Sequence, residues 1–160
     1  MRRALRWLGL ALLAAAVALG VTLVAARFHD GPLGPITGGT FRSGEPAPPP
    51  ADWSFAADAP TLELELPAEL GRSITTGVVV VDGRLYVPCL FANAKRWPHA
   101  VLRDGRVRAR LGGRIYELRA GRVDDPATLA RVAPAFVAKY PETDGTGLGT
   151  RDWLFALQPR

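Results

Sequence analysis

The chain has 160 residues, a formal net charge of +5 and one cysteine, Cys89. A single cysteine excludes an intrachain disulfide. One cysteine and two histidines are also too few for us to expect a metal site built from these side chains. The positive excess lies at the N-terminus, because residues 28–160 contain 16 of the 20 cations and all 15 acids. A region this close to neutral lacks the basic character of a nucleic-acid-binding domain.

An apolar run near the start of the chain covers residues 7–26, WLGLALLAAAVALGVTLVAA. Twenty residues of helix span about 30 Å, the thickness of the hydrocarbon core of a bilayer. A cleaved signal peptide is one alternative, with Val24-Ala25-Ala26 as its cleavage site. Signal cores, however, measure only about 7–15 residues. A buried helix of a soluble protein is another alternative. We expect an uncleaved membrane anchor.

The flanking arginines predict the orientation of this anchor. Arg2, Arg3 and Arg6 precede it and Arg27 alone follows closely, and positive charge favours the cytoplasmic side. We therefore expect a single-pass protein of the cell membrane. Residues 1–27 would form the cytoplasmic tail and transmembrane anchor, with the C-terminal domain outside the cytoplasm.

The residues after the anchor divide into two segments. Residues 28–50 are rich in Gly and Pro and predict a linker, either a spacer or a strap that lies on the domain. Residues 51–160 would form the domain itself. Its first strand signal is TLELEL at residues 61–66, where apolar and acidic side chains alternate as in a half-buried strand.

Residues 74–90 predict a hairpin around the two-residue turn Asp82-Gly83. This turn sets the register, which pairs Val81 with Arg84, Val80 with Leu85, Val78 with Val87 and Thr76 with Cys89. The pairing gathers apolar side chains on one face. Cys89 then reads as a small core residue and not as a nucleophile.

The stretch 95–122 carries nine Lys and Arg residues and only two acids. A second two-residue turn, Gly112-Gly113, predicts a hairpin in which Arg106, Arg108 and Arg110 project together from one face. Only Glu117 stands opposite them, so solvent, an acid from elsewhere in the fold or an anion has to relieve their repulsion. We treat these three arginines as a candidate anion or lipid face, since the anchor holds the domain near lipid headgroups.

Between the hairpins, Trp97-Pro98 predicts the start of a short helix. Lys95 and Arg96 would lie by its N-terminus, where free backbone N–H groups favour an anion, so this is the best position for a phosphate. A structural crossover anchored by Trp97 is the alternative. Further on, residues 125–140 predict a helix that Asp125 caps and Pro134 kinks, residues 145–149 a loop, and residues 152–157 a buried strand.

Signatures of catalysis are weak. The histidines lack metal-ligand spacing and no serine stands in a nucleophile motif, so no catalytic residue is assigned and no metal is expected. Any catalysis would come from a bound cofactor. The predicted fold is a transmembrane helix plus a mainly antiparallel β (α+β) domain of six or seven strands with one or two helices. Closing so few strands into a barrel would remove exposed sheet edges.

Over residues 73–140 the order is strand, Asp-Gly turn, strand, Trp-Pro segment, Arg-rich strand, Gly-Gly turn, strand and helix. This order resembles the split β-barrel superfamily of pyridoxamine-phosphate-oxidase-like flavin proteins and deazaflavin-dependent nitroreductases. WPHAVLRDGRVRARLGGRIYELRAGRV is similar to the nitroreductase pattern in which a helix with Trp and Leu leads into strands. The chain departs from that pattern at residues 88–93, PCLFAN, which lack the glycines of the nitroreductase loop.

The resemblance implies a split barrel that binds FMN or a deazaflavin, in many members at a homodimer interface. By position it implies Arg72, Lys95 and Arg96 as phosphate ligands and Trp97 as a neighbour of the ring. Three functions stay open on the sequence. They are a membrane-anchored flavin-type, oxidoreductase-like domain, a cofactor-free envelope binding or structural module, and a domain that lies on anionic lipid through its arginine face.

Overall fold

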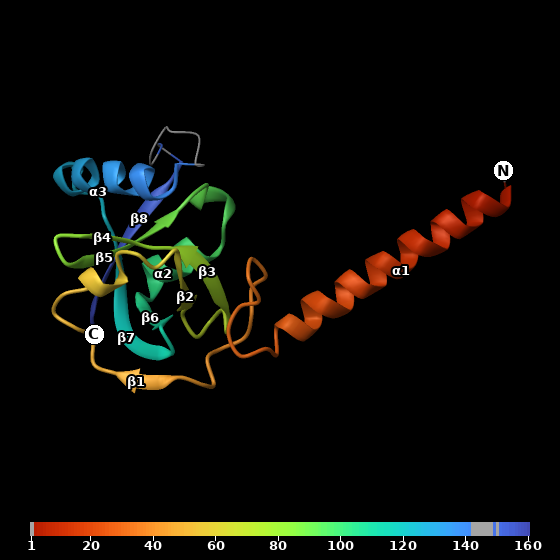
Figure 1. Cartoon of the computed structure of the whole chain (residues 1–160), viewed down its shortest axis with the longest axis horizontal. Helices are drawn as coiled ribbons and strands as arrows, with labels where there is room; N and C mark the ends of the chain where they lie inside the picture. Colours follow the sequence, from red (N-terminus) through yellow and green to blue (C-terminus); the bar gives the residue numbers. More distant parts are fainter. Residues whose placement is uncertain (1, 142–148, 150) are drawn as a thin grey trace.

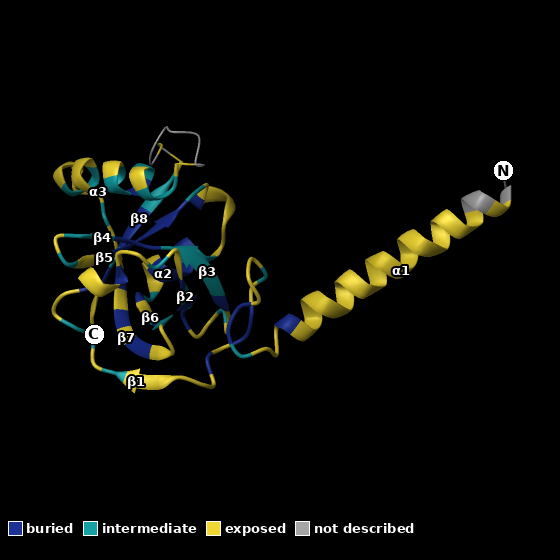
Figure 2. Cartoon of the chain, in the orientation of Figure 1, coloured by how far each residue is buried: buried dark blue, intermediate teal, exposed yellow. Residues whose placement is uncertain are grey.

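Helix α1 (Arg2–Ala26) extends away from the rest of the chain in the computed structural model, which describes residues 2–141, 149 and 151–160 (Figure 1). Its segment Arg6–Ala26 is long and apolar enough to cross a membrane. Its residues 6–25 are exposed, and Ala26 is buried (Figure 2). Nothing in the described chain packs along the apolar surface of α1.

The remaining elements build one sheet and two further helices. The strands are β1 (Glu45–Ala47), β2 (Thr61–Glu65), β3 (Ser73–Gly77), β4 (Val79–Val81), β5 (Arg84–Cys89), β6 (Arg106–Leu111), β7 (Arg114–Arg122) and β8 (Trp153–Pro159). The helices are α2 (Trp97–Arg103) and α3 (Pro126–Lys139), with 3-10 turns at Ser54–Ala56 and Ala92–Ala94.

The sheet closes on itself. Its order is β3-β2-β6-β7-β8-β5-β4, all antiparallel, and the short β1 adds a parallel pairing to β7. The two edge strands, β3 and β4, are consecutive in the chain and only Val78 separates them. One bent segment therefore pairs with both ends of the sheet, which confirms the predicted split barrel.

Both predicted hairpin turns form. Asp82 and Gly83 have φ of 52° and 68°, and Gly112 and Gly113 have φ of 57° and 78°. Positive φ at both central residues is the type I′ geometry, whose twist matches that of the flanking strands. The register of β6 against β7 is as predicted, including Arg108 opposite Glu117.

Two predicted pairings are wrong. The ladder between β4 and β5 contains Val79–Val81 only, so Val78 does not pair with Val87, and Thr76 does not pair with Cys89 but with Leu62 of β2. The cause is the bend at Val78. The Val78 N–H donates to the Tyr140 hydroxyl at 2.8 Å instead of to a strand, and the same hydroxyl donates to the Pro60 carbonyl at 2.7 Å.

The core fills the barrel and a second layer under α3. Buried side chains of β2, β5, β6, β7 and β8 line the interior, and Cys89 is among them as predicted. Val132 and Phe136 of α3 pack on Val79, Tyr86 and Leu154. Asp125 caps α3 by accepting from the Thr128 N–H at 2.9 Å. The loop predicted at residues 145–149 lies, apart from Gly149, outside the described residues.

Residues 28–44, here called the strap, lie on the barrel. Gly38 and Ser73 exchange backbone hydrogen bonds of 3.0 and 3.1 Å, and the Ser73 hydroxyl donates to the Gly39 carbonyl at 2.5 Å. Phe41 is buried, and its N–H donates to Glu65. Of the two alternatives for this segment, the structure has the strap and not the spacer. The residues packed on the barrel therefore begin before residue 51.

Candidate functional site

A cavity of about 710 Å³ opens where the strap, β3, the turn before it and the start of α2 meet. Its volume lies within the range of about 300–1,000 Å³ that is usual for small-molecule sites. Leu66, Leu70, Ile74 and Pro88 give it apolar walls, and Thr75 and Thr76 add hydroxyls from β3.

Four cations line this cavity, namely Arg27, Arg72, Lys95 and Arg96. All four are exposed, and none has a carboxylate within ion-pair distance among the described residues. Glu69 is the one acid of the lining, and Arg103 neutralises it at 2.6 Å. The cavity therefore presents uncompensated positive charge to whatever enters it.

The four residues predicted to hold a cofactor lie together in this cavity. Arg72, Lys95, Arg96 and Trp97 are all part of its lining, although Arg72 precedes β3 and the other three follow β5. Arg27, Thr75 and Thr76 were not predicted. Arg27 was assigned to the flank of the anchor, and only the path of the strap, which sequence periodicity does not encode, brings it here.

The loop that carries Lys95 and Arg96 is held in place at both ends. Before it, the Phe91 N–H donates to Asp152 at 2.7 Å and the Ala92 N–H to the Arg151 carbonyl at 2.9 Å. After it, Trp97 begins α2, with its ring 5.3 Å from the ring of Phe155 in the core. These contacts hold the loop in place without an ion pair to Lys95 or Arg96, so the charge of both side chains stays available to a ligand.

The arginine face predicted on β6 has a different environment. Arg108 binds Glu65 at 2.6 Å, Arg110 binds Glu63 at 2.5 Å and Asp30 at 3.2 Å, and Arg106 binds Asp104 at 2.7 Å. The acids come from β2, which lies beside β6, from the strap and from the residues before β6. An acid from elsewhere in the fold is therefore what relieves the repulsion, and a role of this face toward anions or lipid stays a prediction.

Two pKa values follow from these and neighbouring contacts. Hydrogen bonds from Arg106 lower the pKa of Asp104 to about 2. Burial raises the pKa of the Cys89 thiol to about 11, so it is protonated at neutral pH. Within the described residues no three His, Cys, Asp or Glu side chains gather as metal ligands would.

Comparisons with known proteins bear on the fold. No family model and no curated protein sequence matches the chain. Among solved structures, it resembles a conserved hypothetical protein of Mycobacterium tuberculosis with a TM-score of 0.52 at 20% identity, over 66% of this chain and 76% of that one.

Two further structures have similar scores. HutZ, a heme storage protein of Vibrio cholerae, matches with a TM-score of 0.51 at 17% identity over 66% of this chain and 85% of its own. A putative pyridoxamine 5′-phosphate oxidase of Listeria innocua matches with a TM-score of 0.50 at 13% identity over 63% and 84%. The chain thus shares its split β-barrel fold with these solved structures.

Proposed function

We propose that the chain is a membrane-anchored, oxidoreductase-like split-barrel domain that binds FMN or a deazaflavin in the cationic cavity. The observation that carries the proposal is the gathering of Arg72, Lys95, Arg96 and Arg27 around a cavity with apolar walls, with no carboxylate partner among the residues that the structure describes. Free guanidinium and ammonium groups form the strongest hydrogen bonds to phosphate.

The donor set fits a phosphate-bearing aromatic cofactor. Arg72, Lys95 and Arg96 would hold its phosphate, and Trp97 offers an aromatic surface beside them. A bound flavin supplies hydride or single-electron transfer. The protein's part is to hold the phosphate and to provide an apolar wall at Leu66, Leu70 and Ile74, which shields the site from water.

Heme is the other ligand that a structural neighbour's description suggests. Heme iron needs an axial ligand from His, Cys, Met or Tyr. None of these residue types is present in the described lining of the cavity. The flavin proposal therefore fits the donor set better than a heme proposal does.

Anchoring through α1, with the barrel outside the cytoplasm, belongs to the same proposal. The apolar segment Arg6–Ala26 supports the span, and the three arginines that precede residue 7 support the orientation. A topology reporter fused after Arg160 tests it. We expect activity of a reporter that works outside the cytoplasm, and activity only of a cytoplasmic reporter would contradict the orientation.

Variant titrations test the cofactor site. We expect the full chain in detergent to bind FMN or a deazaflavin, and Lys95→Gln and Arg96→Gln each to weaken binding about 10- to 100-fold, as the loss of a charged hydrogen bond does. Arg84→Gln is the matched control, because Arg84 is exposed and lies outside the cavity. Equal affinity of all variants would remove the cavity as the site.

A further inference from the structure

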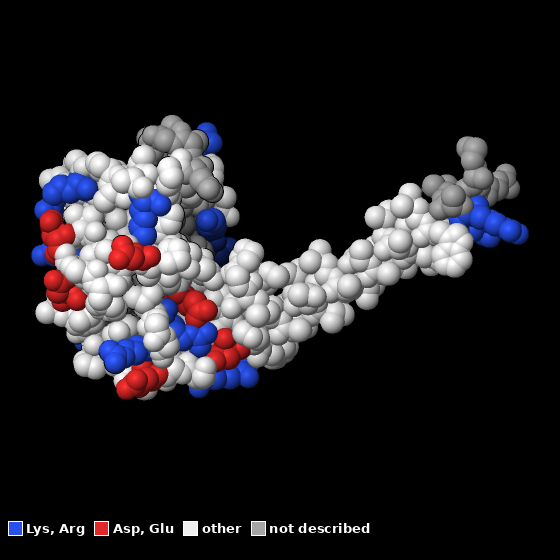
Figure 3. Space-filling model, viewed as in Figure 1, with Lys and Arg blue, Asp and Glu red and all other residues white. Residues whose placement is uncertain are grey.

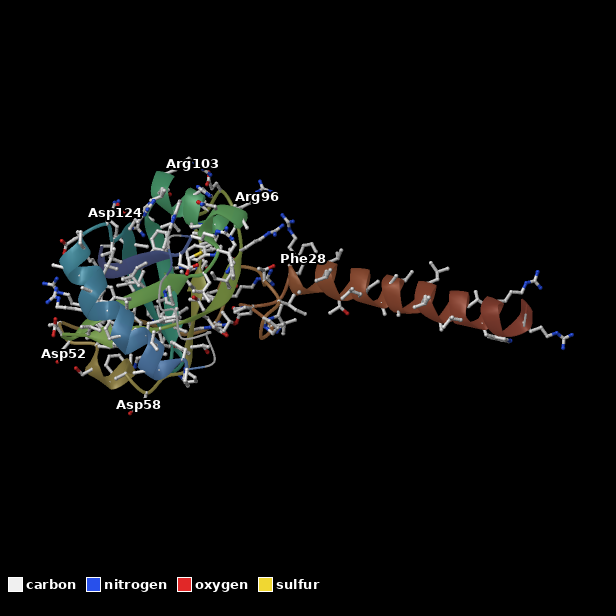
Figure 4. All side chains as sticks on the ribbon, turned by 90° about the horizontal axis from the view of Figure 1, so that it is seen from above. Phe28, Asp52, Asp58, Arg96, Arg103 and Asp124 are labelled. Carbon is white, nitrogen blue, oxygen red and sulfur yellow. The ribbon has the colours of Figure 1, made fainter. Side chains whose placement is uncertain are left out.

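The cationic cavity lies on the side of the barrel from which α1 departs. Arg27, which lines it, directly follows the last residue of α1. Figure 4 shows Phe28 and Arg96 toward this side, whereas Asp52, Asp58 and Asp124 lie away from α1. On the visible face in Figure 3, α1 carries no charge between the barrel and its N-terminal end. Cations without a carboxylate partner in the described chain thus lie toward the anchor, and Asp52, Asp58 and Asp124 lie away from it.

A short, hydrogen-bonded connection joins α1 to the barrel. The Phe28 and His29 N–H groups continue its last turn with bonds of 2.9 and 3.1 Å to the carbonyls of Ala25 and Ala26. The Gly39 N–H then donates to the His29 carbonyl at 3.1 Å, and Gly39 in turn accepts from Ser73 of β3. No flexible spacer intervenes, so a barrel attached to a spanning α1 stays close to the headgroups.

Apolar side chains stand beside the cations at this exit. Phe28 is 67% exposed and Leu33 in the strap is 38% exposed. An aromatic and an aliphatic side chain next to arginines are typical of a surface in the membrane interface, where rings insert at headgroup level and cations meet lipid phosphates.

We propose that this face of the barrel docks on an anionic lipid surface through Phe28, Leu33 and the cavity cations Arg27, Arg72, Lys95 and Arg96. The contact uses other cations than the arginine face on β6, where Arg108 and Arg110 have carboxylate partners. It rests on the proposed anchoring through α1, and not on a bound flavin. A phosphate monoester carries about two negative charges at neutral pH, so four cations leave positive charge for lipid even with a cofactor bound.

Fluorophores at three positions of the full chain in lipid vesicles test the docking. Leu33→Cys reports on the strap next to α1, Ala94→Cys on the cavity rim beside Lys95, and Asp58→Cys on the far side. Native Cys89 is buried, and its raised pKa keeps it unlabelled at neutral pH. The quencher is a lipid with a nitroxide on its headgroup.

In vesicles that contain anionic lipid we expect strong quenching at positions 33 and 94 and little at 58. Each cation near an anionic surface shifts the docked-to-undocked ratio about five-fold, so Arg72→Gln, Lys95→Gln and Arg96→Gln together should lower it about 100-fold. Quenching of the probe at position 94 should then fall toward that at position 58, while the probe at position 33 stays quenched.

Other outcomes would overturn the docking. Quenching at 33 alone in the unmodified barrel would mean an anchored chain whose barrel does not lie on lipid. No quenching at any position would remove the anchoring as well, without bearing on flavin binding. Equal quenching at 94 in purely zwitterionic vesicles would exclude recognition of anionic lipid. Release of the probe at 94 by inorganic phosphate at constant ionic strength would assign the cations to soluble phosphate.

Discussion

At the residue scale, the contrast between two sets of cations decides where an anion can bind. Arg108 and Arg110 are rich in contacts, since each binds a glutamate of β2 and lies over the ring of Phe41, at 5.8 and 4.4 Å. Lys95 and Arg96 have no such partner among the described residues. A cation that already binds carboxylates of the fold has less of its charge to offer to a ligand, whereas a cation without such a partner is available to one.

Tyr140→Phe should destabilise the barrel by about 1–3 kcal/mol, because it leaves the Val78 N–H at the bend without its acceptor. Thermal unfolding followed by tryptophan fluorescence measures this loss. Tyr86→Phe is the control, since Tyr86 is also buried but its hydroxyl makes no hydrogen bond with the described chain. Equal melting temperatures of the Tyr140 variant and the unmodified chain would contradict this role of the hydroxyl.

The strap carboxylate Asp30 should give stability a defined pH dependence. The Ser43 hydroxyl, the Arg42 N–H and Arg110 hold the pKa of Asp30 well below its usual range. A lowered folded-state pKa means that the carboxylate stabilises the fold above about pH 4 and that this contribution is lost as the pH falls toward the folded value.

Asp30→Asn should therefore lower the free energy of unfolding by about 1 kcal/mol at pH 7, the difference between a charged and a neutral hydrogen bond. The difference in free energy of unfolding between this variant and the unmodified chain should decrease as the pH falls from 4 to 2. Melting curves across this range measure it, with the exposed Asp58→Asn as control. A difference that stays constant down to pH 2 would show that the ionised carboxylate is not responsible.

At the element scale, local sequence signals predicted the two hairpins but not the pairing between strands that are distant in the chain. The Asp82-Gly83 and Gly112-Gly113 turns fix their registers within a few residues, and both form. On its other side β6 pairs with β2, and the contacting residues are 43 and 47 positions apart in the chain. No local pattern therefore indicated that Glu65 and Glu63 would meet Arg108 and Arg110. Thr76 differs from its prediction for the same reason. It belongs to β3, which pairs with β2 and not with β5, and this pairing is not encoded in the local sequence of the hairpin.

The strap depends on the absence of a side chain at Gly38. A Cβ there would lie 1.7 Å from the Gly31 carbonyl oxygen and 2.8 Å from the Pro32 Cα, both backbone atoms that cannot turn aside. Gly38→Ala should therefore lift the strap, at a cost of about 1–3 kcal/mol or more, and expose residues 28–44 to protease.

Limited proteolysis with mass spectrometry of the fragments measures this exposure. Gly121→Ala in β7 is the matched control, because a Cβ there would meet nothing within 4 Å. We expect faster cleavage within the strap for Gly38→Ala only. Unchanged protection of the strap in that variant would contradict its close packing on Gly31 and Pro32.

At the scale of the whole molecule, the bent segment β3–β4 closes the barrel, the strap ties α1 to it, and the cavity lies where these parts meet. The resemblance over residues 73–140 was sufficient to predict the split barrel. The four residues that it implied by position, Arg72, Lys95, Arg96 and Trp97, line one cavity, and their role toward a cofactor stays a prediction. The resemblance did not extend to the strap, so Arg27 and the position of the cavity beside α1 became visible only in the structure.

The central claim is that the cationic cavity holds a phosphate-bearing flavin-type cofactor. A native mass spectrum and an absorbance scan of the purified full chain in detergent, before and after addition of FMN or a deazaflavin, test it most directly. We expect a stoichiometric gain of one cofactor mass with a shifted visible band. A colourless chain that gains no mass at saturating cofactor would contradict the claim and favour a cofactor-free binding module.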